Sequence, residues 1–209
     1  QTREAQEWFP KRLQKKSEII YNPVATVFYK QNRTPIKHKI VTCGRLCEVK
    51  NHKMLIDAFV KVLEVVPDAQ LEIYGIGKLE NDLQRLVEKI SLVDHIRLMG
   101  NATNVADVLA MADLFVLSSN QEGLPNALME AMAVGVPSIS TDCPCGGPKE
   151  LFGEELKDML VPVGDVMALA DKMIELLSDD EKRLQVGVAM RKRAEMFQAD
   201  VIGEQWVSY

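Results

Sequence analysis

The 209-residue sequence lacks two features that would each point to a class of protein. It has no hydrophobic run near the ~20 residues that a membrane-spanning helix requires. Its formal net charge is −5, and no basic block is interleaved with aromatic residues, which argues against a nucleic-acid-binding protein. Hydrophobic residues nevertheless make up 47% of the chain, enough for one α/β core with appendages.

Cysteine is scarce as well, with four residues at Cys43, Cys47, Cys143 and Cys145. Their C-x3-C and C-x-C spacings leave a zinc site open as an alternative, but neither has the C-x-x-C spacing of common structural zinc sites. We therefore expect reduced thiols in a cytoplasmic protein, and neither a metal nor another cofactor.

Basic residues cluster near the start of the chain, in the segment KRLQKK from Lys11 to Lys16. A solvated helix face is the simpler interpretation, and weak contact with a membrane surface is the alternative. The chain opens with QTREAQEWFPKR and has no initiator methionine, so we expect a piece of a larger protein.

Apolar, β-branched runs alternate along most of the chain with segments of helical periodicity. Strands are expected at residues 38–44, 69–75, 96–100, 113–119, 136–141 and 158–163. Helical segments between them imply βαβ units, and therefore a parallel sheet with right-handed crossovers. The strands are almost continuously apolar, which indicates that helices cover both faces of the sheet. We predict an α/β fold, a Rossmann-like doubly wound parallel sheet of about six strands.

Three helix starts carry local signals. Asp165 is expected to cap the helix that follows it, and Ser178 with Glu181 fits a capping box for the last long helix. Pro125 suits the first position of the helix that contains Glu130.

Ligands of open parallel α/β sheets bind at the carboxyl ends of the strands. Five loops on that edge hold most of the unusual residues, at 44–51, 75–79, 100–104, 118–126 and 141–150. In the first loop Gly44 ends the strand, Arg45 follows, and Lys50 precedes a helix whose free N–H groups favour anions. Two cations beside a helix start make a site of diphosphate size, although basic residues are also common at loop ends.

The second loop, YGIGKL, has Gly75 and Gly77 in the spacing that begins a dinucleotide-binding fingerprint, but the third glycine is absent. A tight turn between strand and helix explains both glycines equally well. Either way, they permit close approach of the backbone to a phosphate or a ribose.

The stretch EGLPNALMEAMAVG, from Glu122 to Gly135, contains a nearly uncharged helix with a single carboxylate, Glu130. No lysine or arginine stands three or four residues away to pair with it. Its side chain tilts towards the helix N-terminus, on the same face as Asn126. Because an unpaired buried carboxylate is costly, Glu130 faces either water or a ligand, and a ribose diol is the natural candidate.

The spacing of Glu122 and Glu130 resembles the E-x7-E motif of retaining glycosyltransferases of the GT-B fold, in the group often called family 4 or group 1. The resemblance covers nearly the whole chain, and the motif is strong when it stands in register with the GR…K loop. The blocks that match in the family's order are IIYNPV, GRLCEVKNHKMLIDAF, LEIYGIG, HIRLMGN, ADLFVLSSNQEG and GVPSISTD, and GGPKEL resembles the family's loop after the fifth strand.

This resemblance implies roles for the matching residues. Arg45 and Lys50 would hold the donor's diphosphate and stabilise the leaving group. Glu122 would lie near the transferred sugar, and Glu130 would bind the ribose hydroxyls. The remaining donor-binding positions are Gly44, Gly75, Gly77, Gly100, Asn101, Gly123, Leu124, Pro125, Asn126, Ala127 and Leu128. We expect the exposed N–H groups of residues 126–128 to point towards the ligand.

The GT-B fold has two Rossmann-like domains, and the resemblance implies that this chain is the C-terminal, donor-binding half. Residues 1–22 would be the end of the N-terminal domain and the linker, with Ile19–Val24 as an interdomain strand. Residues 23–195 would form the nucleotide-sugar-binding domain, and 196–209 a terminal helix that crosses back. The missing N-terminal domain would bind the acceptor.

As a full-length protein, such an enzyme would transfer a sugar from a nucleotide-diphosphate sugar, with uridine preferred, to a saccharide or lipid-linked acceptor. Bacterial surface polysaccharide synthesis is the expected setting, in the cytoplasm or at the inner face of the membrane, and this fragment alone would be inactive. Two alternatives stay open: a non-catalytic nucleotide-sugar-binding module, and another GT-B enzyme such as a nucleotide-sugar epimerase.

Overall fold

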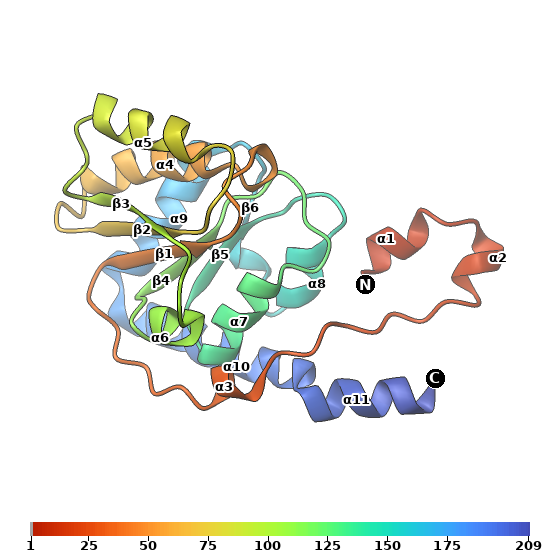
Figure 1. Ribbon diagram of the computed structural model, residues 1–209. Coiled ribbons are helices and arrows are strands. Elements are labelled where there is room, and N and C mark those ends of the chain that lie inside the picture. Colours follow the sequence, from red (N-terminus) through yellow and green to blue (C-terminus); the bar gives the residue numbers. More distant parts are fainter. Residues whose placement is uncertain (1) are drawn as a thin grey trace.

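The computed structural model describes residues 2–209. Within them, six parallel strands form one sheet in the order β3-β2-β1-β4-β5-β6 (Figure 1). The strands are β1 (Lys39–Cys43), β2 (Gln70–Tyr74), β3 (Ile96–Gly100), β4 (Leu114–Leu117), β5 (Ser138–Thr141) and β6 (Leu160–Val161). Each strand lies inside its expected range, so the predicted doubly wound parallel sheet is confirmed.

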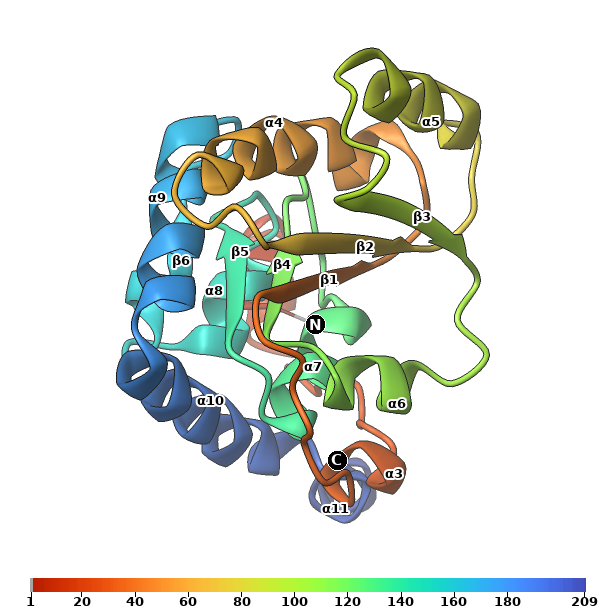
Figure 2. The ribbon, with the colours of Figure 1, turned by 90° about the vertical axis from the view of Figure 1, so that its left-hand side faces the viewer.

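Helices cover both faces of the sheet, as Figures 1 and 2 show. One face carries α4 (His52–Leu63), α5 (Glu80–Lys89) and α9 (Val166–Ser178). The other carries α6 (Val105–Ala110), α7 (Asn126–Val134) and α10 (Asp180–Ala194). Every residue of β1, β4 and β5 is buried between these layers, which explains why the central strand β4 (LFVL) is apolar without alternation.

The direction of strand addition reverses between β1 and β4. From β1 the chain builds outwards through β2 to β3, whereas β4, β5 and β6 extend the sheet on the other side. The two strands are in register at Ile40 opposite Leu114 and Val41 opposite Phe115. Their following loops, 44–51 and 118–125, therefore open at the same point, which is where such sheets form a ligand crevice.

Of the helix starts predicted at Asp165 and Ser178, the structure confirms the first and corrects the second. Asp165 does cap α9, since its carboxylate accepts a hydrogen bond from the Ala168 amide at 2.9 Å. The capping box at Ser178 is wrong, because Ser178 is the last residue of α9 and Asp179 caps α10 through the Lys182 amide at 2.9 Å. Asp179, one residue further on, supplies the capping acceptor, and Ser178 remains part of the preceding helix α9.

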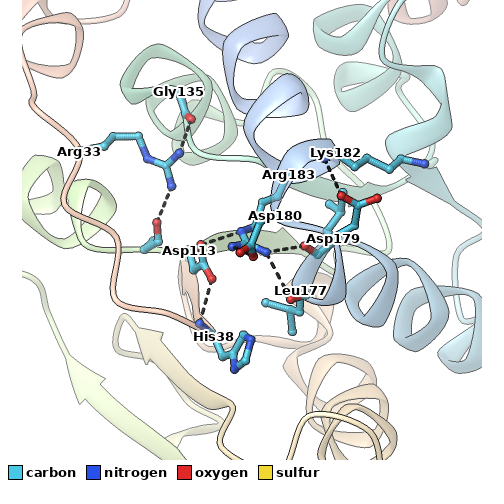
Figure 3. A network of polar contacts seen from close by, with 11 residues as sticks. Arg33, His38, Asp113, Gly135, Leu177, Asp179, Asp180, Lys182 and Arg183 are labelled. Atoms are coloured by element: carbon cyan, nitrogen blue, oxygen red, sulfur yellow. Dashed lines mark hydrogen bonds and ion pairs between the residues drawn. The ribbon is translucent and has the colours of Figure 1, made fainter.

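A buried polar network ties the amino edge of the sheet together, opposite the ligand edge (Figure 3). Asp113, which precedes β4, accepts hydrogen bonds from the His38 amide and pairs with Arg183 Nε, both at 2.8 Å. Arg33 donates to the carbonyls of Ala112 at 2.7 Å and Gly135 at 2.9 Å. Four segments distant in sequence are thereby joined at the end of the sheet that carries no predicted ligand residue.

Residues 21–24 lie beside residues 197–198, which come from near the other end of the chain. Val24 forms an isolated bridge with Gln198, and the rings of Tyr21 and Phe197 meet edge to face with centroids 5.4 Å apart. The expected strand over Ile19–Val24 is otherwise absent, because no strand of the described residues lies alongside to pair with it. The remaining helices are α1 (Arg3–Glu7), α2 (Lys11–Gln14), α3 (Thr26–Tyr29), α8 (Gly147–Phe152) and α11 (Ala199–Ser208).

The helix α11 falls within the expected terminal segment 196–209. The division into domains at residues 22 and 195 stays a prediction. Across residues 2–209, the helices are too short or too polar for any of them to cross a membrane.

Candidate functional site

A pocket of about 450 Å³ opens at the carboxyl ends of β1, β2 and β3. It contains four of the residues predicted from the sequence, Gly44, Arg45, Gly75 and Asn101. Its lining is Cys43, Gly44, Arg45, Tyr74, Gly75, Ile76, Asn101, Ala102 and Val105. The pocket therefore lies where the fold rule for open α/β sheets places a ligand.

The glycines of the second loop are required by the backbone of the first. A Cβ on Gly75, whose φ is +142°, would lie 1.9 Å from the carbonyl oxygen of Gly44. A Cβ on Gly77 would lie 2.3 Å from the carbonyl oxygen of Leu46. The amide of Gly75 also donates to the carbonyl of Gly100 at 2.8 Å. These contacts favour the tight-turn interpretation of the glycines and hold the pocket wall together.

Lys50 and Glu122 meet across the point where strand addition reverses. Lys50 is the last residue of a 3-10 helix over Glu48–Lys50, just before α4. Its side chain packs over Gly44, so that a Cβ added to Gly44 would lie 3.4 Å from Lys50 Cε. Its Nζ lies 2.5 Å from Glu122 Oε1, and the side chains are 21% and 11% exposed. Two of the three predicted catalytic residues thus form a largely buried ion pair.

The third predicted catalytic residue, Arg45, has a different environment. It is exposed on the rim of the pocket, and no carboxylate in the described chain pairs with its guanidinium. A guanidinium keeps its charge and presents a fork of donors, so Arg45 offers a cation to a ligand in this pocket.

Helix α7 brings Glu130 to the same edge. It begins at Asn126, and Pro125 is the N-cap residue rather than the first helical residue, since its extended ψ of 104° lies outside the helix. Glu130 is half-buried and makes no hydrogen bond or ion pair with residues 2–209. Burial raises the pKa of its carboxyl group to about 6.

The carboxylate of Glu130 lies close to the pocket wall. Burial, and then the charge of Glu130, raise the pKa of the Cys43 thiol to about 12, and Cys43 lines the pocket. A half-buried carboxylate without a protein partner, beside a pocket, is suited to accept hydrogen bonds from ligand hydroxyls.

The loop between Glu122 and α7 contributes less than we expected. Leu128 is fully buried and its amide donates to the carbonyl of Pro125 at 3.1 Å, so it has no free N–H to offer. Leu124 is buried as well. Asn126 accepts a hydrogen bond from Asn22 at 2.8 Å through its side chain. In the described part of the chain, the amides of Asn126 and Ala127 donate to no backbone carbonyl.

Sequence reasoning missed five residues of the pocket lining, Ile76, Ala102, Val105 and the two strand ends Cys43 and Tyr74. The last two carry a positional signal. They are the last residues of β1 and β2 and stand opposite each other in the sheet. The hydroxyl of Tyr74 donates to Glu72 at 2.7 Å, and Glu72 pairs with Lys39 at 2.8 Å. Their position at the strand ends was the signal that could have identified them.

No group of three or more His, Cys, Asp or Glu side chains among residues 2–209 is arranged to hold a metal ion. The four cysteines are free thiols. The zinc alternative raised by the cysteine spacing is therefore not supported by the geometry.

Comparisons with known proteins agree with this architecture. Residues 26–193 match the family described as glycosyl transferases group 1. The chain is 31% identical over 200 residues to N-acetyl-alpha-D-glucosaminyl L-malate synthase of Bacillus anthracis, covering 90% of this chain and 52% of that protein.

A second relative is N-acetylgalactosamine-N,N'-diacetylbacillosaminyl-diphospho-undecaprenol 4-alpha-N-acetylgalactosaminyltransferase of Campylobacter jejuni, 30% identical over 199 residues, which cover 93% of this chain and 53% of that protein. The chain thus spans about half the length of both relatives.

Among solved structures, HepE of Anabaena in complex with UDP matches with a TM-score of 0.81 at 19% identity, covering 91% of this chain and 56% of that one. That likeness concerns the fold, a Rossmann-like α/β sheet whose structural neighbours are GT-B glycosyltransferases. The family match covers most of the chain, including every residue of the candidate site. The chain therefore belongs to the glycosyl transferases of group 1.

Proposed function

We propose that this chain is the donor-binding half of a retaining glycosyltransferase that uses a UDP-sugar. The observation that carries the proposal is the meeting of Lys50 and Glu122 at the reversal of strand order, beside the pocket lined by Arg45. Cations and a carboxylate are thereby placed together where this type of sheet binds ligands.

The proposed chemistry follows from the charges. When the bond to the anomeric carbon breaks, negative charge develops on the departing diphosphate, and fixed cations lower the barrier by stabilising it. Arg45 and Lys50 supply this charge, so no metal is needed. The leaving phosphate then helps to deprotonate the acceptor on the same face of the sugar, and Glu122 orients the sugar without acting as a nucleophile.

Glu130 is the proposed ribose ligand. Its carboxylate is half-buried and has no partner in residues 2–209, and a ribose diol offers two hydroxyl donors. Hydrogen bonds to the ionised form would offset the cost of burying the charge.

The uridine preference is supported by the UDP in the structure of Anabaena HepE. A lipid-linked or saccharide acceptor, in bacterial surface polysaccharide synthesis, is supported by the undecaprenol-linked acceptor in the name of the Campylobacter relative. The acceptor would bind to an N-terminal domain, with which an exposed aromatic residue such as Trp206 is available to pack. The fragment alone is then expected to transfer no sugar.

We place the full-length enzyme in the cytoplasm, with peripheral contact at the inner face of the membrane. The basic segment Lys11–Lys16 next to exposed Trp8 and Phe9 supports such contact, because cations and interfacial aromatics favour an anionic lipid surface.

Calorimetric titration of the chain with UDP, GDP and ADP tests the proposal. We expect selective binding of UDP that is weakened at least tenfold by Arg45→Ala and by Glu130→Ala. Arg85→Ala, which removes an exposed arginine on α5, is the control and should bind like the wild type. Binding of none of the three nucleotides, or binding indifferent to Arg45→Ala and Glu130→Ala, would contradict it.

A further inference from the structure

The two oxygens of the Glu122 carboxylate have different environments. Oε1 accepts hydrogen bonds from both Lys50 Nζ at 2.5 Å and Ser119 Oγ at 2.6 Å. Oε2 has no hydrogen-bond partner in residues 2–209. One oxygen is thus committed to the protein, and the other remains available to a ligand hydroxyl.

Ser119 is fixed by the sheet rather than by the loop. It lies two residues after β4 and is completely buried. Its carbonyl accepts a hydrogen bond at 2.5 Å from the hydroxyl of Thr141, the buried last residue of β5. Its own hydroxyl therefore reaches Glu122 from a rigid position, and O–H···O⁻ bonds of this length are among the stronger hydrogen bonds in proteins.

The neighbouring Ser118 holds the other side of the ion pair. Its hydroxyl donates to the carbonyl oxygens of Lys50 at 3.0 Å and Asn51 at 3.1 Å, and so fixes the backbone that carries Lys50. Ser118 acts on the lysine and Ser119 on the carboxylate. The two consecutive serines are therefore expected to affect different parts of a bound donor.

We propose that Ser119 is a positioning residue, which fixes Glu122 so that Oε2 faces a hydroxyl of the donor sugar. The inference rests on the proposed function. Once a diphosphate is bound, the Lys50 ammonium group interacts with two anions, the Glu122 carboxylate and the diphosphate. Its hydrogen bond to Glu122 then weakens as it moves towards the phosphates. Without Ser119, the carboxylate would follow the lysine or be pushed out of position by the negative charge of the phosphates. With Ser119, the carboxylate keeps its orientation, so Oε2 is already positioned to accept a hydrogen bond from the sugar hydroxyl.

The test is a double-mutant cycle on ligand affinity. UDP and a panel of UDP-glucose, UDP-galactose and UDP-N-acetylglucosamine are titrated into the wild-type chain, Ser119→Ala, Glu122→Gln and the double variant. The readout is the affinity of the tightest UDP-sugar relative to UDP. We expect Ser119→Ala to lower this ratio about tenfold while UDP affinity changes less than twofold, and to have no further effect on the ratio in the Glu122→Gln background.

Two variants separate positioning from folding. Ser119→Thr keeps the hydroxyl and should restore the ratio. Ser138→Ala removes a completely buried serine hydroxyl on β5 that donates to Val136 at 2.8 Å, away from the site, and should leave the ratio unchanged. Ser118→Ala should weaken UDP and UDP-sugars alike.

The outcomes are distinct. No binding of UDP by the wild-type chain overturns the proposed function. If UDP binds, three results each overturn the role of Ser119. The wild-type chain could bind UDP and every UDP-sugar with equal affinity, or Ser119→Ala could leave the ratio of UDP-sugar to UDP affinity unchanged. In the third result, Ser119→Ala lowers this ratio by the same factor in the wild-type and Glu122→Gln backgrounds.

Discussion

Gly147 packs directly against the carbonyl oxygen of Gly123, so closely that a Cβ at position 147 would lie 1.5 Å from that oxygen. Gly147 is the first residue of α8, and Gly123 follows Glu122 in the loop after β4. The amide of Glu122 also donates to the carbonyl of Pro144 at 3.2 Å, just before α8. The loop after β5 therefore sets the position of the loop that carries Glu122.

Gly147→Ala should displace the Glu122 loop, because neither backbone can accommodate the methyl group without moving. We expect UDP-sugar affinity to fall at least tenfold and the free energy of unfolding to fall by about 1–3 kcal/mol. Calorimetry and urea denaturation measure the two effects. The control for affinity is Gly203→Ala on α11, where the added Cβ meets nothing within 4 Å beyond its own stretch of helix. If both variants bind UDP-sugars like the wild type, the contact does not constrain the loop.

Glu130→Gln should stabilise the unliganded chain at neutral pH. Burial raises the pKa of Glu130 from 4.5 to about 6, so its contribution to stability is greatest below pH 4.5 and is lost as the pH rises through 6. Above that pH the ionised carboxylate opposes folding by at most about 2 kcal/mol, because solvent screens its exposed part, and glutamine avoids this cost.

Urea denaturation at pH 7.5 and at pH 4 measures this difference. We expect the variant to gain up to about 2 kcal/mol at pH 7.5 and nothing at pH 4. A variant less stable than the wild type at pH 7.5 would mean that Glu130 has a stabilising protein partner.

Donor affinity should depend on the ionisation of Glu130. If its carboxylate accepts the ribose hydroxyls, binding favours the ionised form, so affinity rises as the pH passes through about 6. We expect UDP-glucose to bind roughly tenfold more tightly at pH 7.5 than at pH 5. UDP-glucose is the suitable probe because its diphosphate is a diester without a terminal phosphate that titrates near pH 6. If the affinity of Glu130→Gln for UDP-glucose depended on pH in the same way, the pH dependence would belong to another group.

Asp113→Ala should be the most destabilising of the variants proposed here. Asp113 and Arg183 are 4% and 12% exposed, and removal of Asp113 leaves the buried arginine with the exposed Asp180 as its remaining carboxylate partner. We expect a loss of about 3–5 kcal/mol in the free energy of unfolding. Asp180→Ala removes an exposed carboxylate from the same arginine and should have little effect, as urea denaturation will show. Comparable losses in both variants would refute the importance of burial.

The strands and the ligand edge were predictable because local patterns encode them. The apolar run at Leu114–Leu117 and the loop that begins at Gly44 each follow from a few consecutive residues. The contact between Lys50 and Glu122 did not follow, since it joins residues 72 positions apart and depends on β4 lying next to β1. The hydrogen bond from the Leu128 amide to the Pro125 carbonyl was likewise missed, because the position of a helix start is uncertain by a residue or two from sequence alone.

The location of the nucleotide site is the central claim, and NMR amide shifts of the labelled chain during titration with UDP test it most directly. We predict that the shifts cluster in the loops 44–51, 75–79, 100–105 and 118–128 around the 450 Å³ pocket. Amides near Asp113 and His38, at the opposite edge of the sheet, should not move. Shifts that cluster instead around the pocket of about 500 Å³ lined by His38, Asp68 and Asp180 would contradict the account.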